Sequence, residues 1–499
     1  MKDKLPKSVY NWISLIGVTI AIISLFMIIF LFAISILIEQ QSSYLGLIIF
    51  ILLPSFLVLG LILIPVGMLI SRKRRPRSEE FKLPYVDLNN TRHRNAFIIF
   101  SVGTVIFLFL SAIGSYEAFH YSESVEFCGT ICHTVMEPEY VAYQNSAHAR
   151  VTCAECHVGT GADWFVKSKL SGLYQVYAVI TDVYPRPIET PIANLRPARE
   201  TCEKCHWPQK FYARKLRTEK HFLTDEKNTP WDISMVMKIG SDHSSSALQE
   251  GIHWHINPDV KIEYAATDFK LNNIPWVKYT NKKTGESKIF RDGDTNDDDL
   301  NLDSLTVKTM DCMDCHNRPS HNYLPPSLFV NNEMAAGRIS ASLPEIKSKL
   351  MELCETEFGN KDSANLFIKN EITNFYKEDY PNIYAEKLNE IEETTTNFMS
   401  AYSKNIFPEM KVRWSHYPTH IGHLEFDGCF RCHNDTHATE DGEVISNDCN
   451  LCHVIVGQGT EDDFVFANIN EPLEFKHPVD IEEAWKESLC TDCHTGLNP

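Results

Sequence analysis

Basic residues are scarce in this chain: 47 Lys and Arg stand against 65 Asp and Glu over 499 residues, a formal net charge of -18. A nucleic-acid-binding surface needs many basic side chains to neutralise phosphates, so nucleic acid is excluded as an expected partner. Several of the basic residues are also gathered at positions 72–77. The rest of the chain is therefore strongly acidic, which predicts a soluble partner with a basic face.

Cysteine is almost absent outside one repeated pattern, and long apolar runs are absent after residue 116. Fourteen of the fifteen cysteines fall in pairs that are followed directly by His, so they do not read as the disulfide framework of a small secreted protein. The remaining one, Cys354, is expected to be a buried thiol. An apolar N-terminal part and a Cys- and His-rich polar part thus need separate interpretation.

Three long apolar runs lie near the N-terminus, at residues 12–38, 45–70 and 96–116. The first is longer than the ~20 residues that a helix needs to cross hydrocarbon, and no small-residue cleavage site follows it. Basic residues precede the first run and follow the second, whereas the turn at residues 39–44 has none. The positive-inside rule then predicts a three-helix transmembrane anchor with a cytoplasmic N-terminus and everything after Tyr116 outside.

The sequence Cys-x-x-Cys-His occurs six times, and a seventh copy has three residues between its cysteines. Two cysteines about one turn apart can bond the two vinyl groups of a porphyrin, and the next residue ligates the iron. Zinc knuckles are the alternative, but they require no His after every second Cys. The motifs therefore predict seven covalently bound haem c groups, numbered 1 to 7 in chain order. The attaching cysteines are Cys128, Cys132, Cys153, Cys156, Cys202, Cys205, Cys312, Cys315, Cys429, Cys432, Cys449, Cys452, Cys490 and Cys493. The motif histidines are His133, His157, His206, His316, His433, His453 and His494.

Electron-transferring haem also needs a second axial ligand, usually His or Met. Thirteen histidines lie outside the motifs, of which His93 is cytoplasmic in the predicted topology. Any one of the others could instead be an ordinary surface or hydrogen-bonded histidine. The candidates chosen by position are His148, His321, His253, His255, His416, His420, His423, His437 and His477, with His120, His221 and His243 less favoured. Because His253 and His255 are two residues apart, only one of them is expected to face a given haem if that stretch is extended.

The motifs and the spaces between them predict four segments. These are an anchor at 1–119, a tetrahaem domain at 120–325 with a β insert at about 256–305, a helical spacer at 326–405 and a trihaem domain at 406–499. Within the insert, residues 261–266, 276–280 and 287–290 are predicted strands, with a turn at 281–285. The predicted fold class is a mainly α multihaem cytochrome c with little regular structure around the haems.

Residues from about 96 to 321 resemble the NapC/NirT family of membrane quinol dehydrogenases, which pair a transmembrane helix with four c haems. The matching pieces are the helix before the first motif, Met136 shortly after His133, residues 143–148, and the run from Asp311 to His321. The longer layout is similar to the seven-haem inner-membrane cytochromes of metal-respiring bacteria. Family members usually have one anchor helix and a strict first motif with Met two residues after the His. Met136 stands three after His133 here, so whether His133 or Met136 ligates haem 1 stays open.

The resemblance implies a bacterial inner-membrane protein with periplasmic haem domains. Its expected partners are the membrane quinol pool, with menaquinol as the expected substrate, and a periplasmic multihaem cytochrome or reductase with a basic face. Quinol oxidation releases two protons and two electrons, so a site beside a haem needs a proton acceptor and a cation. Asp163 and Lys167, after the second motif, are four residues apart and share a helix face. They form either an ordinary surface ion pair or, as the family's acidic residue and Lys imply, part of the quinol site. Lys169, Glu137 and Glu139 are further candidates.

These features predict a quinol dehydrogenase that passes electrons to a periplasmic acceptor. One alternative is a passive haem conduit or anchor subunit of a partner complex. Another is a terminal reductase, against which stands the absence of a Cys-x-x-Cys-Lys motif. The final acceptor, the quinone type and the oligomeric state are not determined by the sequence.

Overall fold

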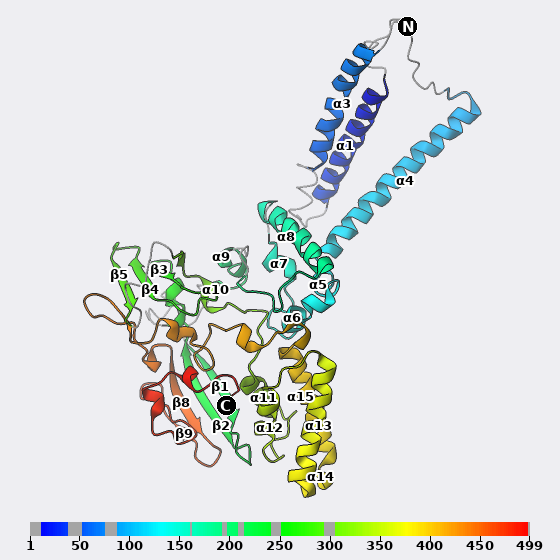
Figure 1. The fold of residues 1–499 in the computed structure, drawn as a ribbon. Coiled ribbons are helices and arrows are strands. Elements are labelled where there is room, and N and C mark those ends of the chain that lie inside the picture. Colours follow the sequence, from blue (N-terminus) through cyan, green and yellow to red (C-terminus); the bar gives the residue numbers. More distant parts are fainter. Residues whose placement is uncertain are drawn as a thin grey trace. The chain divides into compact units, whose positions relative to one another are not determined.

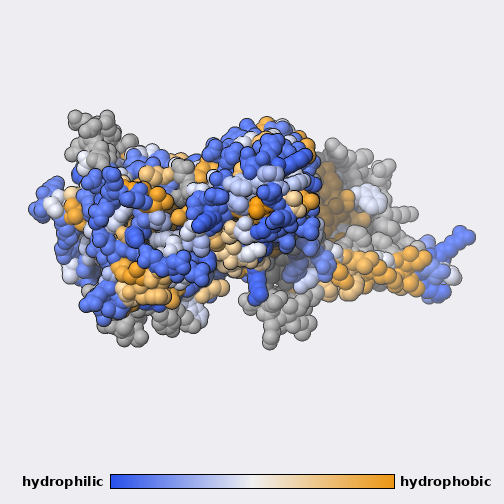
Figure 2. Space-filling view, turned by 90° about the horizontal axis from the view of Figure 1, so that it is seen from below, coloured by the Kyte–Doolittle hydropathy of each residue, from blue (hydrophilic) through white to orange (hydrophobic). Residues whose placement is uncertain are grey.

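The computed structural model describes residues 11–37, 52–74, 87–159, 162–191, 197–207, 214–240, 251–293 and 305–497 (Figure 1). Its contacts divide the chain into two compact units. Unit 1 comprises residues 1–124 and 157–174, and unit 2 comprises residues 125–156 and 175–499. Hydrophobic residues dominate the visible helices of unit 1, whereas hydrophilic residues cover most of the visible face of unit 2 (Figure 2).

Helices α1 (Trp12–Leu37) and α3 (Leu53–Arg74) of unit 1 pack against each other through small residues. A Cβ atom added at Gly17 would come within 2.7 Å of the Gly60 carbonyl oxygen, so the helices approach closely here. The Ser14 hydroxyl donates to the Ile64 carbonyl oxygen at 2.9 Å. Small residues and inter-helix hydrogen bonds are how helices associate in lipid, where burying apolar surface brings little advantage.

Two helical stretches among the described residues are long and apolar enough to cross a membrane, Trp12–Leu31 and Leu53–Ser71. They coincide with the first two predicted spans. The third predicted span, residues 96–116, lies inside α4 (Thr91–Ser122), whose N-terminus is capped by the Asn90 side chain. The region is thus helical as predicted, while a three-helix anchor stays a prediction.

The predicted strands of the insert form the centre of an antiparallel sheet in unit 2, in the order β6-β3-β4-β5-β7. The turn between β4 and β5 is closed by a hydrogen bond from the Gly285 N–H to the Asn281 carbonyl oxygen at 2.8 Å, and Gly285 takes the positive φ that favours glycine. The strands are β3 (Val260–Ala265), β4 (Trp276–Asn281), β5 (Ser287–Asp292), β6 (Val307–Thr309) and β7 (His437–Ala438).

A second antiparallel sheet, in the order β1-β2-β8-β9, was not predicted. It pairs strands that follow the third motif with strands that follow the sixth, so that Met237 lies opposite His453. The predicted tetrahaem and trihaem segments are therefore joined by main-chain hydrogen bonds. The strands are β1 (Arg214–Phe222), β2 (Pro230–Lys238), β8 (His453–Gly459) and β9 (Val465–Phe466).

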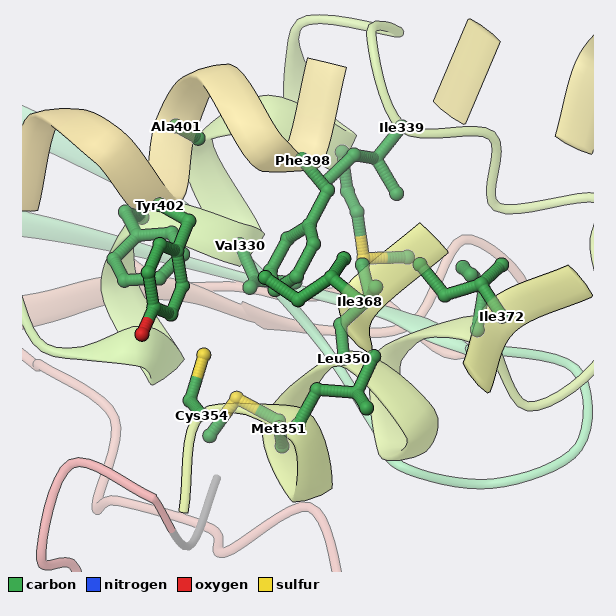
Figure 3. Packing of buried hydrophobic residues seen from close by; sticks show 14 of the residues in the cluster. Val330, Ile339, Leu350, Met351, Cys354, Ile368, Ile372, Phe398, Ala401 and Tyr402 are labelled. Atoms are coloured by element: carbon green, nitrogen blue, oxygen red, sulfur yellow. The ribbon is translucent and has the colours of Figure 1, made fainter. Parts of the chain in front are cut away.

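The predicted helical spacer has its own hydrophobic core (Figure 3). Val330, Ile368 and Phe398 come from three different helices and are fully buried against one another. Phe222 of β1 and Trp414 join the same cluster, so the spacer is packed into unit 2. The helices are α11 (Pro326–Ala335), α12 (Ile346–Leu353), α13 (Lys361–Asp379), α14 (Pro381–Glu386) and α15 (Leu388–Asn405).

Candidate haem sites

The cysteine motifs fold into short helical turns. In the third, fourth, fifth and seventh motifs, the N–H of the His donates to the carbonyl oxygen of the first Cys at 2.8 to 3.0 Å. This bond closes one turn and sets the two cysteines at the spacing that the two porphyrin vinyl groups require. The turns are α5 (Val125–Thr130), α7 (Cys153–His157), α9 (Ala198–Cys202), α10 (Cys312–Cys315), η8 (Gly428–Arg431), η9 (Cys449–Leu451) and η11 (Cys490–Asp492). At the first motif, α6 (His133–Gln144) begins directly at the His, whose side chain lies outside the described residues.

Five motif histidines each face one of the histidines outside the motifs, all within unit 2. The ring centroids are 5.9 Å apart for His206 and His148, 6.3 Å for His316 and His253, 5.9 Å for His433 and His255, 6.1 Å for His453 and His423, and 6.1 Å for His494 and His477.

These separations fit an iron between two imidazoles. A metal–imidazole bond of about 2 Å on each side places the two ring centroids roughly 6 Å apart. The rings of one pair lie almost parallel, with 7° between His253 and His316, whereas those of His255 and His433 are almost perpendicular, at 79°. A common separation with different ring angles is expected for two axial ligands, because the iron fixes the distance and not the rotation.

Hydrogen bonds orient the distal imidazoles. The Nδ1 atoms of three of them lie 2.8 to 3.1 Å from a backbone carbonyl oxygen, which can only accept, so Nδ1 carries the proton and Nε2 is left to bind a metal. The bonds are His148 to Pro319, His253 to Ile239 and His255 to Ile252. His477 Nδ1 lies 2.7 Å from the Val479 carbonyl oxygen and 3.2 Å from the Val479 backbone nitrogen, so these contacts do not set its tautomer. Burial also lowers the pKa of His253, His255 and His423, which favours the neutral imidazole that ligates iron.

A single short helix carries two of the histidines that face motif histidines. The 3-10 helix η4 (Ile252–Ile256) directs His253 toward His316 of the fourth motif and His255 toward His433 of the fifth. The alternation at period two was noted in the sequence, but the two separate partners were not predictable from it. Trp254 between them stacks on Tyr279 of β4, with ring centroids 5.5 Å apart.

The space beside these histidines is large enough for porphyrins. A cavity of about 1810 Å³ is lined by His316, His433, His453 and His494. Pockets for a single small ligand usually measure about 300–1,000 Å³, so this cavity fits more than one large planar group. The residues present therefore fit haem at the fourth to seventh motifs.

The sulfur atoms of successive motifs lie near one another. A hydrogen bond to Cys128 and burial raise the pKa of Cys153, and a hydrogen bond to Cys312, burial and the charge of Cys156 raise the pKa of Cys202. Further along the chain, Cys429 contributes after burial to the raised pKa of both Cys315 and Cys452, and Cys449 contributes after burial to that of Cys490. Thioether sulfurs do not titrate, so these interactions matter as a sign of proximity. The seven cysteine motifs form one series in chain order.

Other predicted ligands are placed differently. His437 is buried, and hydrogen bonds occupy both ring nitrogens, Nδ1 with Asn434 Oδ1 at 2.8 Å and Nε2 with the Ile274 carbonyl oxygen at 2.6 Å. Neither nitrogen is thus directed toward an iron. His420 is buried with Nδ1 on the Asp314 carbonyl oxygen, and its buried Nε2 has no hydrogen-bond partner in the described part of the chain. The structure sets no motif histidine opposite His416 or His420 among the described residues.

His321 and Met136 lie near the first two motifs. His321 Nδ1 lies 3.1 Å from the Glu139 carbonyl oxygen, the same orienting bond as in the other distal histidines. The Met136 N–H donates to the Cys132 carbonyl oxygen at 2.9 Å. Of the less favoured histidines, His221 lies 3.5 Å from a Glu219 carboxylate oxygen, His120 contacts the Tyr116 ring, and His243 lies outside the described residues.

The predicted quinol-site residues after the second motif lie on α8 (Ala162–Thr181). Lys167 is exposed, and its Nζ lies 4.7 Å from the centroid of the Trp164 ring. The backbones of Asp163 and Lys169 are helical, and their side chains lie outside the described residues. The apolar stripe predicted on this helix is strongly exposed: Leu170 is 62%, Leu173 68% and Tyr177 58% accessible.

Two glutamates of α6 differ in environment. Glu137 lies 3.9 Å from Lys361 Nζ and is half-exposed. Burial raises the pKa of Glu139, an effect that its own backbone and the Arg318 guanidinium oppose. Glu137 is therefore a solvent-accessible carboxylate, whereas the surroundings of Glu139 favour its protonated form.

Residues 90–189 match the NapC/NirT cytochrome c family, N-terminal region. Across almost the whole chain, the sequence is 42% identical over 491 residues to the cytochrome c-type protein ImcH of Geobacter sulfurreducens, covering 97% of this chain and 95% of that protein. The chain is a NapC/NirT-family c-type cytochrome. No solved structure matches it. Family membership confirms the resemblance inferred from the motifs and implies covalently bound haem c and a role in electron transport.

The mass of the protein gives the number of covalently bound haems in this NapC/NirT cytochrome. Denaturing mass spectrometry should show the chain heavier by seven haem masses, because each of the seven motifs has two cysteines for thioether bonds. A Cys128→Ala, Cys132→Ala variant should lose one haem mass and serves as the control for the irregular motif. A wild-type mass with six haems would contradict its assignment.

Replacing His148 or His321 by Ala should convert one haem of the cytochrome from low to high spin, because an axial ligand is lost. His437→Ala is the matched control: its ring nitrogens are engaged by protein atoms, so the spin state should not change. Electron paramagnetic resonance of the oxidised protein measures the high-spin signal. Unchanged low-spin spectra in both ligand variants would reject these assignments.

Proposed function

We propose that this cytochrome oxidises a quinol at the outer face of the bacterial inner membrane and passes the electrons through seven haems to a periplasmic acceptor. The observation that carries the proposal is the ordered series of attachment sites from Cys128 to Cys490, in which successive motifs are neighbours. When bound, each haem accepts and releases a single electron without a proton. Chain order then gives a continuous route away from the anchor.

The proposed anchor consists of α1, α3 and α4, with the N-terminus in the cytoplasm. Helices α1 and α3 have the length and hydropathy of membrane spans. Helix α4 is 32 residues long and exposes many large apolar side chains, including Val105, Phe109 and Leu110. The first haem motif begins six residues after this helix ends, at Cys128. The electron entry point is thereby assigned to the membrane end of the series.

The proposed quinol site uses α8 and the residues near it. Its exposed apolar stripe suits contact with lipid and with a lipid-soluble quinol, and Trp164 suits the membrane interface. Asp163 is assigned the role of proton acceptor, and Lys167 stabilises the negative charge that develops on the quinol oxygen. Lys169 is assigned a supporting role as a second cation.

The histidine pairs favour electron transfer over substrate reduction. At five motifs two imidazoles face the same metal position, so no coordination site is left there for a substrate such as nitrite. A passive conduit would share this ligation but would not react with quinol itself. The distinction between conduit and dehydrogenase therefore depends on the entry reaction.

A direct assay tests that reaction. Purified full-length holoprotein in detergent is mixed anaerobically with a reduced menaquinol analogue, and haem reduction is followed by absorbance. Rapid reduction by quinol supports the proposal. Reduction by dithionite but not by quinol would identify a conduit that receives electrons from a partner protein.

A further inference from the structure

The last 41 residues of the chain carry an exceptional share of its negative charge. Residues 459–499 contain ten Asp and Glu against two Lys and no Arg, a net charge of -8 out of -18 for the whole chain. All ten acidic residues are exposed. This segment is fewer than a tenth of the residues, so the charge is concentrated rather than spread over the surface.

The two lysines of the segment neutralise only part of this charge. Lys486 Nζ lies 2.8 Å from Glu474 and 3.1 Å from Glu483, and Lys476 Nζ lies 3.5 Å from Asp463. The other seven acidic side chains form no ion pair within the described residues. They are Glu461, Asp462, Glu471, Asp480, Glu482, Glu487 and Asp492.

Four of these acidic residues lie close in the chain to the two histidines of the seventh haem site. His477 and His494 face each other with ring centroids 6.1 Å apart, and Asp480, Glu482 and Glu487 lie on the loop between them. Asp492 stands within the seventh motif itself, next to the exposed Cys493. The acidic side chains are therefore close in the chain to both axial ligands and to the edge of the site that comes to the surface.

Exposed apolar side chains lie among these charges. Phe466 on the edge strand β9 is 79% accessible, and Val479, two residues after His477, is 53% accessible. Gln458 of β8, the strand that pairs with β9, is hydrogen-bonded to the segment that precedes His477. Its side chain donates to the Glu474 carbonyl oxygen at 2.6 Å and accepts from the Lys476 N–H at 3.1 Å. Docking surfaces usually combine exposed apolar side chains with charged ones, and this segment carries both.

Exposed cysteines also occur at the sixth motif, where Cys449 is exposed, and at the third motif, which lacks the charge of the seventh. Cys205 of the third motif is exposed, as is Trp207 beside it. The described residues around it, 197–207, include two acidic and two basic side chains, which gives no net charge. Arg199 and Glu203 also pair, at 3.8 Å. Exposure alone does not distinguish the third haem site from the seventh, whereas the net charge of the surrounding residues does.

We propose that the acidic face, defined as the ten acidic residues of 459–499 with Val465, Phe466 and Val479, is where electrons leave, and that it docks a small soluble c-type cytochrome with basic residues around its haem edge. The direction of flow rests on the proposed function. His477 and His494 would hold the donor haem, which would lose one electron (Fe²⁺ to Fe³⁺) as the partner's haem gains it (Fe³⁺ to Fe²⁺). No bond forms and no proton moves.

A charge-neutralising variant tests the surface. Full-length holoprotein is reduced with dithionite, freed of excess reductant and mixed in a stopped-flow instrument with an oxidised basic monohaem cytochrome c. The variant Glu482→Gln, Glu483→Gln, Glu487→Gln should lower the second-order rate constant about tenfold at low ionic strength, because opposite charges steer encounter. The difference should vanish at high salt, where exposed charges are screened.

The matched control removes three exposed acidic charges from the helical spacer: Glu378→Gln, Asp379→Asn, Glu386→Gln. Its rate should stay within about twofold of wild type, because those residues lie outside the acidic face. An acidic monohaem cytochrome should accept electrons slowly from the wild-type protein. Equal rates in the two triple variants, or equal rates with acidic and basic acceptors, would overturn the inference.

The same samples separate this inference from the proposed function. Haem reduction by quinol is measured without any acceptor, and discharge to the acceptor is measured after dithionite. If quinol reduces the haems normally and the rate of electron transfer to the acceptor is the same in the Glu variant as in wild type, only the docking surface is overturned. If quinol does not reduce the haems but electron transfer to the acceptor still depends on the acidic residues, only the proposed quinol dehydrogenase activity is overturned.

Discussion

Quinol-driven haem reduction is expected to slow by about 100-fold or more when Asp163 is replaced by Asn or Lys167 by Met. Loss of a positioned proton acceptor or of a charge that stabilises a developing anion typically costs this much in rate. Stability should hardly change, because exposed charges at a surface contribute only about 0 to 1 kcal/mol. Stopped-flow absorbance with a menaquinol analogue measures the rate, and dithionite reduction of the same sample should be normal.

Asp182→Asn provides the control for these two variants. Asp182 directly follows α8, is exposed and forms an ion pair with Arg186 at 2.6 Å, so it is another acidic residue of the same region without an assigned role. Its removal should leave the quinol rate unchanged. Wild-type kinetics in Asp163→Asn and Lys167→Met would exclude both residues and direct attention to Glu137, Glu139 and Lys169.

Local features of this protein could be predicted from the sequence because local chemistry determines them. The Cys-x-x-Cys-His spacing is itself the geometry of one helical turn, and the motifs fold as such turns. The alternating apolar residues of the insert became β3, β4 and β5, with the turn closed at Gly285. The first two apolar runs became helices long enough to span a membrane.

Long-range partners could not be predicted in the same way. The sequence gives no reason why His255 faces His433 while His437, close to the same motif, bonds to Asn434 and the Ile274 carbonyl oxygen. That difference depends on main-chain pairing between distant segments, since β7 at His437 extends the sheet of β5. The pairing of β2 with β8 is of the same kind, because neither strand indicates its partner.

Loss of either histidine of η4 is expected to interrupt electron flow at one haem, the fourth for His253 and the fifth for His255. His253→Ala and His255→Ala each remove one axial ligand, and axial ligation sets haem reduction potentials over a range of about 0.8 V. A change of roughly 59 mV alters a one-electron equilibrium tenfold, so the affected step becomes unfavourable or slow. When quinol is added to His255→Ala, the haems of the first four motifs should be reduced rapidly and the remaining three slowly. In His253→Ala, the haems of the first three motifs should be reduced rapidly and the remaining four slowly.

Ring orientation makes the two variants distinguishable in the oxidised protein as well. The near-perpendicular imidazoles of His255 and His433 leave two iron d orbitals almost equal in energy, which gives a highly anisotropic low-spin signal. The near-parallel rings of His253 and His316 separate these orbitals and give a rhombic one. His255→Ala should therefore remove an anisotropic signal, and His253→Ala a rhombic signal. His437→Ala, the neighbouring control, should keep both signals and a single reduction phase. If both η4 variants lost the same signal, the two histidines would affect one and the same haem, and η4 would not provide ligands to both the fourth and the fifth haem.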